Sequence, residues 1–357
     1  MAQSQGYPVV SEGSNRKEPQ RILVTGASGL LGINLALEAS REHTIFGLVN
    51  DHRLNPTISF PAMLSSIARL YSTARLGTTS SENRLVVVQG DLVVPGTVER
   101  LLDEIQPDWV IHCAALANLD ACEADPAQAW KINTEVPRLL AEHVARGGAR
   151  LLHVSTDAVF DGLKGNYTET DLPNPTGVYA RTKLDAEQAV LDANPEAIVA
   201  RVNLFGYSLT RKRSLSEFFL YNLQAGEKVM GFTDVFFCPL LANHLGQVFL
   251  LMLERGLSGL YHTVSSECLS KYDFGLRIAR LFGLDENLIL PTSIAQGGLK
   301  ATRSPNLSLR TDKLAETLGL TLPTTSTGLE SFYQLYQDGY PEYIRRLVSS
   351  QSGSDNS

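Results

Sequence analysis

The sequence contains few of the residues that build metal centres or disulfide frameworks. Its four cysteines, in a chain of 357 residues, are Cys113, Cys122, Cys238 and Cys268. They show no C-x-x-C spacing, and no histidines stand beside them at the spacing of zinc ligands. We therefore predict reduced and mostly buried thiols, as in a cytoplasmic protein, and no metal site.

Long apolar runs and an excess of positive charge are also missing. No uninterrupted apolar stretch approaches the ~18–20 residues of a membrane-spanning helix, and the longest candidate is Val248–Leu253. The N-terminus carries no apolar signal region. The formal net charge is −7, which argues against a general binder of nucleic acid or of acidic membranes. These absences favour a cytoplasmic protein with neither kind of partner.

The length and the ends of the chain suggest its organisation. A chain of 357 residues is expected to form one large domain or two closely joined ones, and 43% hydrophobic residues suffice for a core. Residues 1–19 and 349–357 are polar, and we predict that both are disordered tails.

Short apolar runs alternate with segments of helical spacing over residues 20–205. Runs that are apolar throughout favour a parallel sheet covered on both faces, so we predict a doubly wound α/β domain that binds a dinucleotide. The expected strands are Ile22–Thr25, Thr44–Val49, Leu85–Val88, Trp109–Cys113, Leu151–Ser155 and Ala197–Val202. The expected helices are Leu30–Arg41, Thr97–Ile105, Pro126–Arg146 and Tyr179–Asn194.

Two regions depart from this alternation. Residues 51–84 form an insertion after the second strand, and a helical pattern over 61–75 suggests a lid or an oligomer contact. Over residues 206–348 the rhythm changes, and we predict a smaller C-terminal α/β lobe that binds substrate. Within it, the helix expected over 239–255 would return to the main domain.

Three glycines follow the first strand with the spacing G-x-x-G-x-x-G. Gly26 can make the tight turn, Gly29 leaves room for phosphate, and Gly32 lets the following helix pack closely on the sheet. The start of that helix offers free N–H groups to a pyrophosphate. We therefore predict a dinucleotide site, with a turn that binds nothing as the alternative. The expected contacts on this turn are Gly26, Ser28, Gly29, Leu30, Leu31 and Gly32.

The end of the second strand bears on the choice of cofactor. Asn50 stands where an acidic residue would favour NAD, and Arg53 could meet the 2′-phosphate of NADP. We favour NADP(H), while NAD(H) stays open because Asp51 could turn inward and Arg53 could be an exposed loop charge.

Two further strand ends are expected along the cofactor. Asp91 could accept a hydrogen bond from the adenine amino group or could cap its own turn. Small residues after the fourth strand would let the cofactor lie over the sheet edge, with tight packing as the alternative. The contacts expected at these two ends are Asp91, Leu92, Ala114 and Ala115.

Tyr179 and Lys183 stand four residues apart in an expected helix and therefore share one face. An ammonium beside a phenol lowers the phenol pKa, so Tyr179 would become an acid or base usable near neutral pH. Lys183 could also hold the ribose hydroxyls of a nicotinamide. The pair therefore predicts proton transfer to or from a carbonyl beside a bound dinucleotide.

The fifth strand ends in Ser155, Thr156 and Asp157. Residues at the carboxyl ends of strands face the ligand crevice of an open α/β sheet. Ser155 or Thr156 could therefore hydrogen-bond the substrate carbonyl, with a plain hydroxyl-rich strand end as the alternative. Asp157 could serve as a second acid or as a loop cap.

These motifs resemble the extended short-chain dehydrogenase/reductases. A narrower likeness is S-T-D-A-V-F-D-G over 155–162, followed by V-Y-A-R-T-K-L over 178–184. Both resemble motifs of the dTDP-4-dehydrorhamnose reductase branch, S-T-D-Y-V-F-D-G and V-Y-G-x-[ST]-K. The segment R-S-P-N over 303–306 resembles the late R-P-x-N of that branch, and the likeness spans roughly residues 21–347.

The resemblance implies a Rossmann fold and NAD(P)H-dependent reduction of a 4-keto sugar carried on a nucleotide diphosphate. By position, Thr156, Tyr179 and Lys183 would be catalytic, and Asn133 would support the lysine through water. The implied partner is a nucleotide-diphosphate sugar, with a homodimer as one open form of assembly. The residues carried over as substrate contacts are Ser155, Asp157, Asn203 and Arg303.

Three departures from that branch concern the substrate side. Ala158 replaces a tyrosine, residues 201–206 lack the usual R-T-S-W, and Arg310 replaces an aspartate. The same branch includes the regulatory β subunit of methionine adenosyltransferase, so a cofactor-binding protein without turnover is one alternative. A nucleotide-sugar epimerase or dehydratase is another, although no glutamate follows Asp157 as a second acid/base.

Overall fold

The computed structural model describes residues 18–50, 85–211, 214–296 and 304–348. The predicted insertion 51–84, with Asp51 and Arg53, lies outside the described residues, as do Arg303, residues 1–17 of the first predicted tail and the whole of the second. The glycine turn, the Tyr-x-x-x-Lys helix and the strand ends between them all lie within the described ranges.

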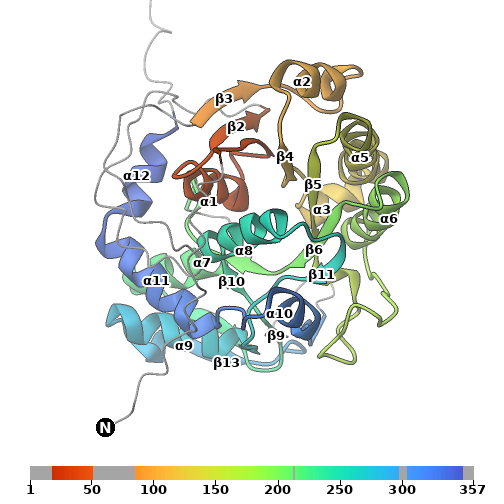
Figure 1. Ribbon diagram of the computed structural model, residues 1–357. Coiled ribbons are helices and arrows are strands. Elements are labelled where there is room, and N and C mark those ends of the chain that lie inside the picture. Colours follow the sequence, from red (N-terminus) through yellow and green to blue (C-terminus); the bar gives the residue numbers. More distant parts are fainter. Residues whose placement is uncertain (1–17, 51–84, 212–213, 297–303, 349–357) are drawn as a thin grey trace, which may run out of the picture.

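Seven strands of the described ranges form one parallel sheet (Figure 1). Its order is β11-β6-β5-β4-β1-β2-β3, and every neighbouring pair is parallel. The order reverses between β1 and β4, which is where a doubly wound sheet binds its ligand. The predicted fold class is thus confirmed. The bounds are β1 Arg21–Thr25, β2 Thr44–Val49, β3 Leu85–Gln89, β4 Trp109–His112, β5 Arg150–Thr156, β6 Ile198–Val202 and β11 Gly259–His262.

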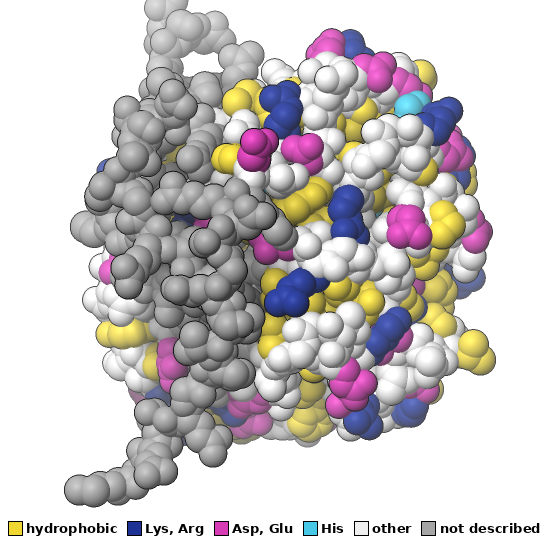
Figure 2. Space-filling model, viewed as in Figure 1, with side chains coloured by type: hydrophobic (Ala, Val, Ile, Leu, Met, Phe, Trp, Pro, Cys, Tyr) yellow, Lys and Arg dark blue, Asp and Glu magenta, His cyan; other side chains and the backbone are white. Residues whose placement is uncertain are grey.

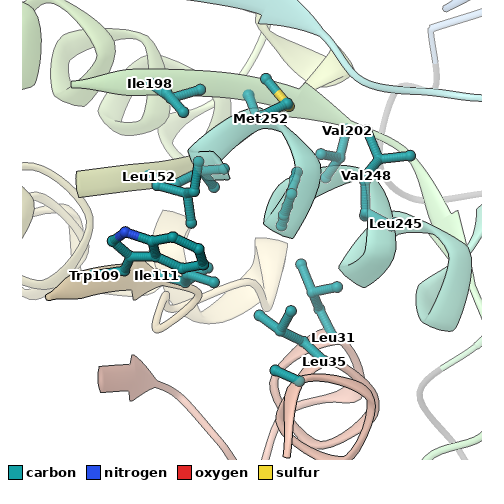
Figure 3. Packing of buried hydrophobic residues seen from close by; sticks show 14 of the residues in the cluster. Leu31, Leu35, Trp109, Ile111, Leu152, Ile198, Val202, Leu245, Val248 and Met252 are labelled. Atoms are coloured by element: carbon teal, nitrogen blue, oxygen red, sulfur yellow. The ribbon is translucent and has the colours of Figure 1, made fainter. Parts of the chain in front are cut away.

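Helices cover both faces of this sheet (Figure 1). Ile22 and Val24 of β1 pack on the side of α1 and α8, where Leu35, Leu245 and their neighbours form a core (Figure 3). Leu23, between them, packs on the opposite side with α2, α5 and α6. Successive strand residues face opposite sides, so a strand that is apolar throughout serves both layers. The bounds are α1 Leu30–Ala39, α2 Thr97–Ile105, α5 Val136–Gly147, α6 Val178–Ala193 and α8 Ala242–Glu254.

Among the described residues of the C-terminal part, three two-stranded sheets and the helices α7, α9, α11 and α12 surround an aromatic core. Phe205, Phe219, Phe274 and Phe332 are fully or almost fully buried there. The small sheets pair β7 (Leu204–Phe205) with β10 (Leu240–Leu241), β8 (Val229–Phe232) with β13 (Ile289–Thr292), and β9 (Phe236–Phe237) with β12 (Leu269–Ser270). The helices are α7 Leu215–Gln224, α9 Lys271–Phe282, α11 Thr325–Gln337 and α12 Tyr340–Arg346.

Some elements of the C-terminal part belong to the main sheet or to the helices that cover it. β11 pairs with β6 at the edge of the main sheet, and α10 (Asp312–Leu318) packs near it. In the cluster that also contains Leu314 and Leu318 of α10, α8 lies against α1, and a Cβ at Gly246 would be 3.2 Å from Leu35 Cδ1. The division into units 20–205 and 206–348 therefore stays a prediction.

The long helix expected over 126–146 is interrupted. It comprises α4 (Pro126–Trp130), a π-helical turn over Lys131–Glu135, and α5. Such turns within helices often accompany functional sites, and this one places Asn133 beside α6, as described below. A further short helix, α3 (Leu119–Ala124), precedes it.

The prediction that all four cysteines are reduced is wrong for one pair. Cys238 and Cys268 form a disulfide, with Cα atoms 4.1 Å apart, whereas Cys113 and Cys122 are free. The two bonded residues come together because β9 and β12 pair antiparallel with Phe237 opposite Leu269, which sets Cys238 beside Cys268. Their separation of 30 residues along the chain gave no sign of this contact.

The surface agrees with the charge balance of the sequence. On the face shown in Figure 2, acidic and basic side chains of the described residues are interspersed with apolar ones. Among the described helices, none has both the length and the apolar character needed to cross a membrane.

Candidate active site

The glycine turn is closed by contacts that a side chain at Gly26 or Gly32 would block and that one at Gly29 would crowd. Gly26 has φ +66°, and a Cβ there would lie 2.8 Å from the backbone N and Cα of Ala114. A Cβ on Gly32 would lie 2.2 Å from the carbonyl oxygen of Gly26, and one on Gly29 would lie 3.1 Å from the same atom. The three glycines therefore let β1, the turn, α1 and the end of β4 approach closely, as the sequence predicts.

Helix α1 presents an uncapped N-terminus at this turn. Gly29 is its N-cap residue and provides no side-chain cap, and the first turn contains no acidic residue. The first intrahelical bond runs from Ile33 N to Gly29 O at 3.1 Å, so the N–H groups of Leu30, Leu31 and Gly32 have no acceptor within the helix. These donors and the positive end of the helix dipole fit a pyrophosphate. Leu31 is buried, so it could contribute only its backbone.

Replacing Gly32 by alanine is expected to weaken dinucleotide binding at least tenfold and to destabilise the fold by about 1–3 kcal/mol, because the added methyl overlaps backbone atoms. Gly147→Ala is the control, since a Cβ there meets nothing within 4 Å. NADPH binding by fluorescence and thermal unfolding would measure both effects. Unchanged binding in Gly32→Ala would show that the turn does not need this close approach.

The ends of β4 and β3, beside the turn, differ in how well they fit the cofactor contacts predicted for them. Ala114 N donates to Thr25 Oγ1 at 3.2 Å, and Ala115 is exposed next to it. Asp91 Oδ1 accepts from Val93 N at 3.0 Å, which is the turn-capping alternative, although the second oxygen of the carboxylate can still accept from a ligand.

The rest of the predicted adenosine side is polar and open. Asn50 is exposed at the end of β2, and its carbonyl accepts from Gln89 Nε2 at 3.2 Å. Ser28 and Leu30 are partly exposed at the turn, and Leu92 packs partly buried against α2. Arg53, which was predicted to contact the 2′-phosphate of NADP beside Asn50, lies outside the described residues.

Helix α6 carries Tyr179 in its first turn, and α3 fixes where that turn begins. The N-cap residue Gly177 offers no side chain, and Glu123 Oε1 accepts the N–H of Val178 at 2.8 Å instead. A carboxylate at a helix N-terminus is also favoured by the helix dipole. Glu123 was not predicted from the sequence, because no motif surrounds it.

The π-helical turn holds α6 from the side. Asn133 Nδ2 donates to Thr182 Oγ1 and to Leu116 O, both at 3.1 Å, and its Oδ1 accepts from Leu116 N at 2.8 Å. Thr134 Oγ1 donates to Thr182 O at 2.7 Å. Asn133 is thus a buried clamp between the loop after β4 and the residue that precedes Lys183.

The Tyr179 pKa shifts in the direction opposite to our expectation. Burial raises the pKa of Tyr179 to about 12, and its hydrogen bond with Thr156 offsets only part of that rise. The carboxyl of Asp157 and the thiol of Cys122 raise the pKa further. Tyr179 is therefore a neutral phenol at physiological pH, which suits a proton donor better than a base.

Lys183 does not depress the Tyr179 pKa because its ammonium is engaged elsewhere. The side chain is 2% exposed, and Nζ donates to Val154 O at 2.7 Å and to His153 Nε2 at 3.1 Å. Burial lowers the Lys183 pKa to about 8. His153, which the sequence analysis did not select, is a neutral imidazole because burial and the nearby Lys183 hold its pKa well below the usual range.

Thr156, Asp157 and Asn203 meet beside Tyr179. Asn203 Nδ2 donates to Asp157 Oδ2 at 2.6 Å, and Thr156 Oγ1 donates to Asp157 Oδ1 at 3.2 Å. Both Thr156 and Asp157 are buried, and burial raises the Asp157 pKa to about 6 even though these hydrogen bonds oppose the rise. The structure thus brings together four residues that the sequence analysis placed in one site.

Ser155 is turned toward a buried ion pair. Its hydroxyl donates to Glu187, whose carboxylate also receives Arg201 Nη2 at 2.7 Å and Arg201 Nε at 2.9 Å. Glu187 and Arg201 are 4% and 2% exposed. The network joins β5, α6 and β6, so Ser155 orients the strand that carries Thr156. An arginine in a strand of otherwise apolar residues was the signal that could have revealed it.

Comparison with known proteins is consistent with this geometry. The family model described as RmlD substrate binding domain matches residues 20–338. The chain is 32% identical to dTDP-4-dehydrorhamnose reductase of Mycobacterium tuberculosis, over 80% of this chain and 83% of that protein. It is 29% identical to methionine adenosyltransferase 2 subunit beta of Mus musculus, over 84% of this chain and 83% of that protein.

A solved structure shares the fold. It is dTDP-4-dehydrorhamnose reductase of Bacillus anthracis in complex with NADP, with a TM-score of 0.72 and 23% identity over 88% of this chain and 99% of that one. Because the family model covers nearly all the described residues, and because a reductase more than 30% identical aligns over most of its own length, the chain belongs to the RmlD substrate binding domain family.

Proposed function

We propose that the protein is an NAD(P)H-dependent reductase of a 4-keto sugar linked to a nucleotide diphosphate. The observation that carries this proposal is that Tyr179 lies beside Thr156 and Asp157 at the end of β5, on a helix that also carries the buried Lys183. The relatedness to a dTDP-4-dehydrorhamnose reductase supports the same reaction class. A location in the cytoplasm and a nucleotide-sugar partner form part of the proposal.

The residues of this chain would act as follows. The N–H groups at the start of α1 bind the pyrophosphate, and Lys183, held by Val154 O and His153, keeps its remaining donor for the ribose. When bound, the cofactor supplies the hydride. Tyr179 gives its proton to the oxygen that becomes an alkoxide, and Thr156 hydrogen-bonds the same oxygen.

NADP(H) is the cofactor that we propose, with NAD(H) second. Asn50 ends β2 where an acidic side chain would select NAD, and the related structure from Bacillus anthracis contains NADP. Comparing NADPH with NADH affinity tests this choice. A preference for NADH of tenfold or more would overturn it.

The sugar pocket is proposed to lie between the end of β5 and the C-terminal part, with residues 20–205 binding the dinucleotide and residues 206–348 the sugar. Asp157 and Asn203 are its described candidate contacts. Because Ala158, Asn203 and Arg310 depart from the family motifs, the sugar is left as a class of nucleotide-linked 4-keto hexoses.

The test is oxidation of NADPH at 340 nm with a panel of nucleotide-diphosphate 4-keto sugars. Turnover with at least one sugar is the expected result, with the alcohol product identified by mass spectrometry. Tight NADPH binding without oxidation by any member of the panel would contradict the proposal.

A second candidate is a regulatory subunit that binds the cofactor without turnover. The 29% identity to methionine adenosyltransferase 2 subunit beta favours it. Affinity purification from the native cell distinguishes the two. A stoichiometric methionine adenosyltransferase in the eluate, together with no reductase activity, would support this candidate.

A further inference from the structure

The hydrogen of the Thr156 hydroxyl is already in use. A threonine hydroxyl has one hydrogen and two lone pairs. One lone pair accepts from Ala158 N at 3.2 Å, and the hydrogen goes to Asp157 Oδ1 at 3.2 Å. Tyr179 lies beside Thr156, where its hydroxyl could only donate to the remaining lone pair. In this arrangement Thr156 has no hydrogen to offer a substrate oxygen.

Protonation of Asp157 releases that hydrogen. An ionised carboxylate can only accept, whereas a protonated one can donate. Its Oδ2 is already held by Asn203 at 2.6 Å, so a proton would reside on the Oδ1 side and point to Thr156. Once Tyr179 turns to the substrate, the two Thr156 lone pairs accept from Ala158 N and from Asp157, and the Thr156 hydrogen is free.

We propose that Asp157 is a positioning residue for the reduction, whose carboxyl proton decides whether Thr156 donates to Asp157 or to the substrate oxygen. This inference rests on the proposed function, and it deepens that function by assigning a second, switchable donor to the developing alkoxide. Donors aimed at such an oxygen contribute strongly to catalysis.

The groups around Asp157 bring its pKa near physiological pH, so the carboxyl can gain or lose its proton there. Burial raises the Asp157 pKa to about 6, and the opposing influences are Asn203, Thr156, Ala158 N and the charge of Lys271 at the start of α9. Tyr179, from α6, is the other titratable group that interacts with it. Asp157 is neutral below this pKa and ionised above it, so the donor from Thr156 is present at acid pH and lost as the pH rises.

The test compares single-turnover oxidation of bound NADPH at pH 5 and pH 8 in the full-length protein, with the panel sugar that the wild type reduces fastest. The wild-type rate is expected to fall about 100-fold, since about 1% of Asp157 is neutral two pH units above its pKa. Asp157→Asn keeps the shape, accepts from Asn203 and donates permanently to Thr156. Its rate is expected to stay within about threefold across this range.

Asp312→Asn is the matched control, because Asp312 is exposed and pairs with Arg310 at the surface. It should keep the wild-type pH profile. A wild-type profile in Asp157→Asn would overturn the inference while leaving the reductase function intact.

A measurement without sugar distinguishes a failure of the proposed function from a failure of the inference about Asp157. Infrared difference spectra between pH 5 and pH 8 should contain a protonated carboxyl band in the wild type that Asp157→Asn lacks. If no sugar is reduced but this band is present, the proposed function fails and the titration of Asp157 stands. If the two proteins give the same spectra, the inference fails whatever the activity.

Discussion

Replacing Tyr179 by phenylalanine is expected to slow reduction by about 10²–10⁴-fold while leaving NADPH affinity within about twofold of the wild type. The phenol is the proton donor to the substrate oxygen, and general acid catalysis typically contributes this much. Because burial raises the Tyr179 pKa to about 12, the phenol stays protonated through the physiological range, and its own ionisation should not limit reduction below about pH 10. Single-turnover kinetics and fluorescence titration with NADPH measure the two quantities.

Tyr333→Phe is the control for that substitution. Tyr333 lies on α11, and its ring packs edge-on against Phe282 with the ring centroids 5.0 Å apart. Its hydroxyl therefore has no part in the proposed site. It should keep the full rate. A Tyr179→Phe protein that reduces the sugar at the wild-type rate would exclude Tyr179 as the donor.

Replacing Glu187 by alanine is expected to lower the free energy of unfolding by about 3–5 kcal/mol. The substitution leaves the Arg201 guanidinium buried at 2% exposure without its carboxylate, and an unpaired buried charge carries a penalty of this size. Ser155 loses its acceptor in the same step. Urea denaturation followed by circular dichroism measures the change.

Two further variants test whether burial of the ion pair causes the loss of stability in Glu187→Ala. Glu286→Ala removes a surface carboxylate bound by Arg280 with the same two-nitrogen geometry, and it should cost less than about 1 kcal/mol. The double variant Glu187→Leu and Arg201→Met replaces both charges with apolar side chains and should recover most of the lost stability. An equal loss for Glu187→Ala and Glu286→Ala would contradict this explanation.

The sequence was most informative where a short range of the chain determines the structure. The expected strand Thr44–Val49 and the helix Thr97–Ile105 have the observed bounds, because apolar spacing and turn residues are local signals. The glycine turn was also predictable, since each glycine answers a steric need within a few residues or at a neighbouring strand end. Tyr179 and Lys183 were found by a spacing that helix geometry makes meaningful.

Contacts between distant segments were not predictable from one sequence. Lys183 turns to His153, Glu123 caps α6 from 55 residues away, and Cys238 bonds to Cys268, yet no local pattern marks these partners. The direction of the Tyr179 pKa shift was predicted wrongly for the same reason. Helical spacing shows that Lys183 shares a face with Tyr179, but only the packing around β5 shows where its ammonium is bound.

Strand β5 has a consequence for how the chain tolerates changes in length. His153 and Ser155 both contact α6, through Lys183 and Glu187, while Leu152 and Val154, which alternate with them, pack in the core shared with α8. A single added residue upstream of these positions would turn both polar side chains to the other layer, leaving two polar groups of α6 facing apolar side chains. An insertion or deletion of one codon within β5 would therefore displace all of these contacts together, whereas a substitution changes them one position at a time.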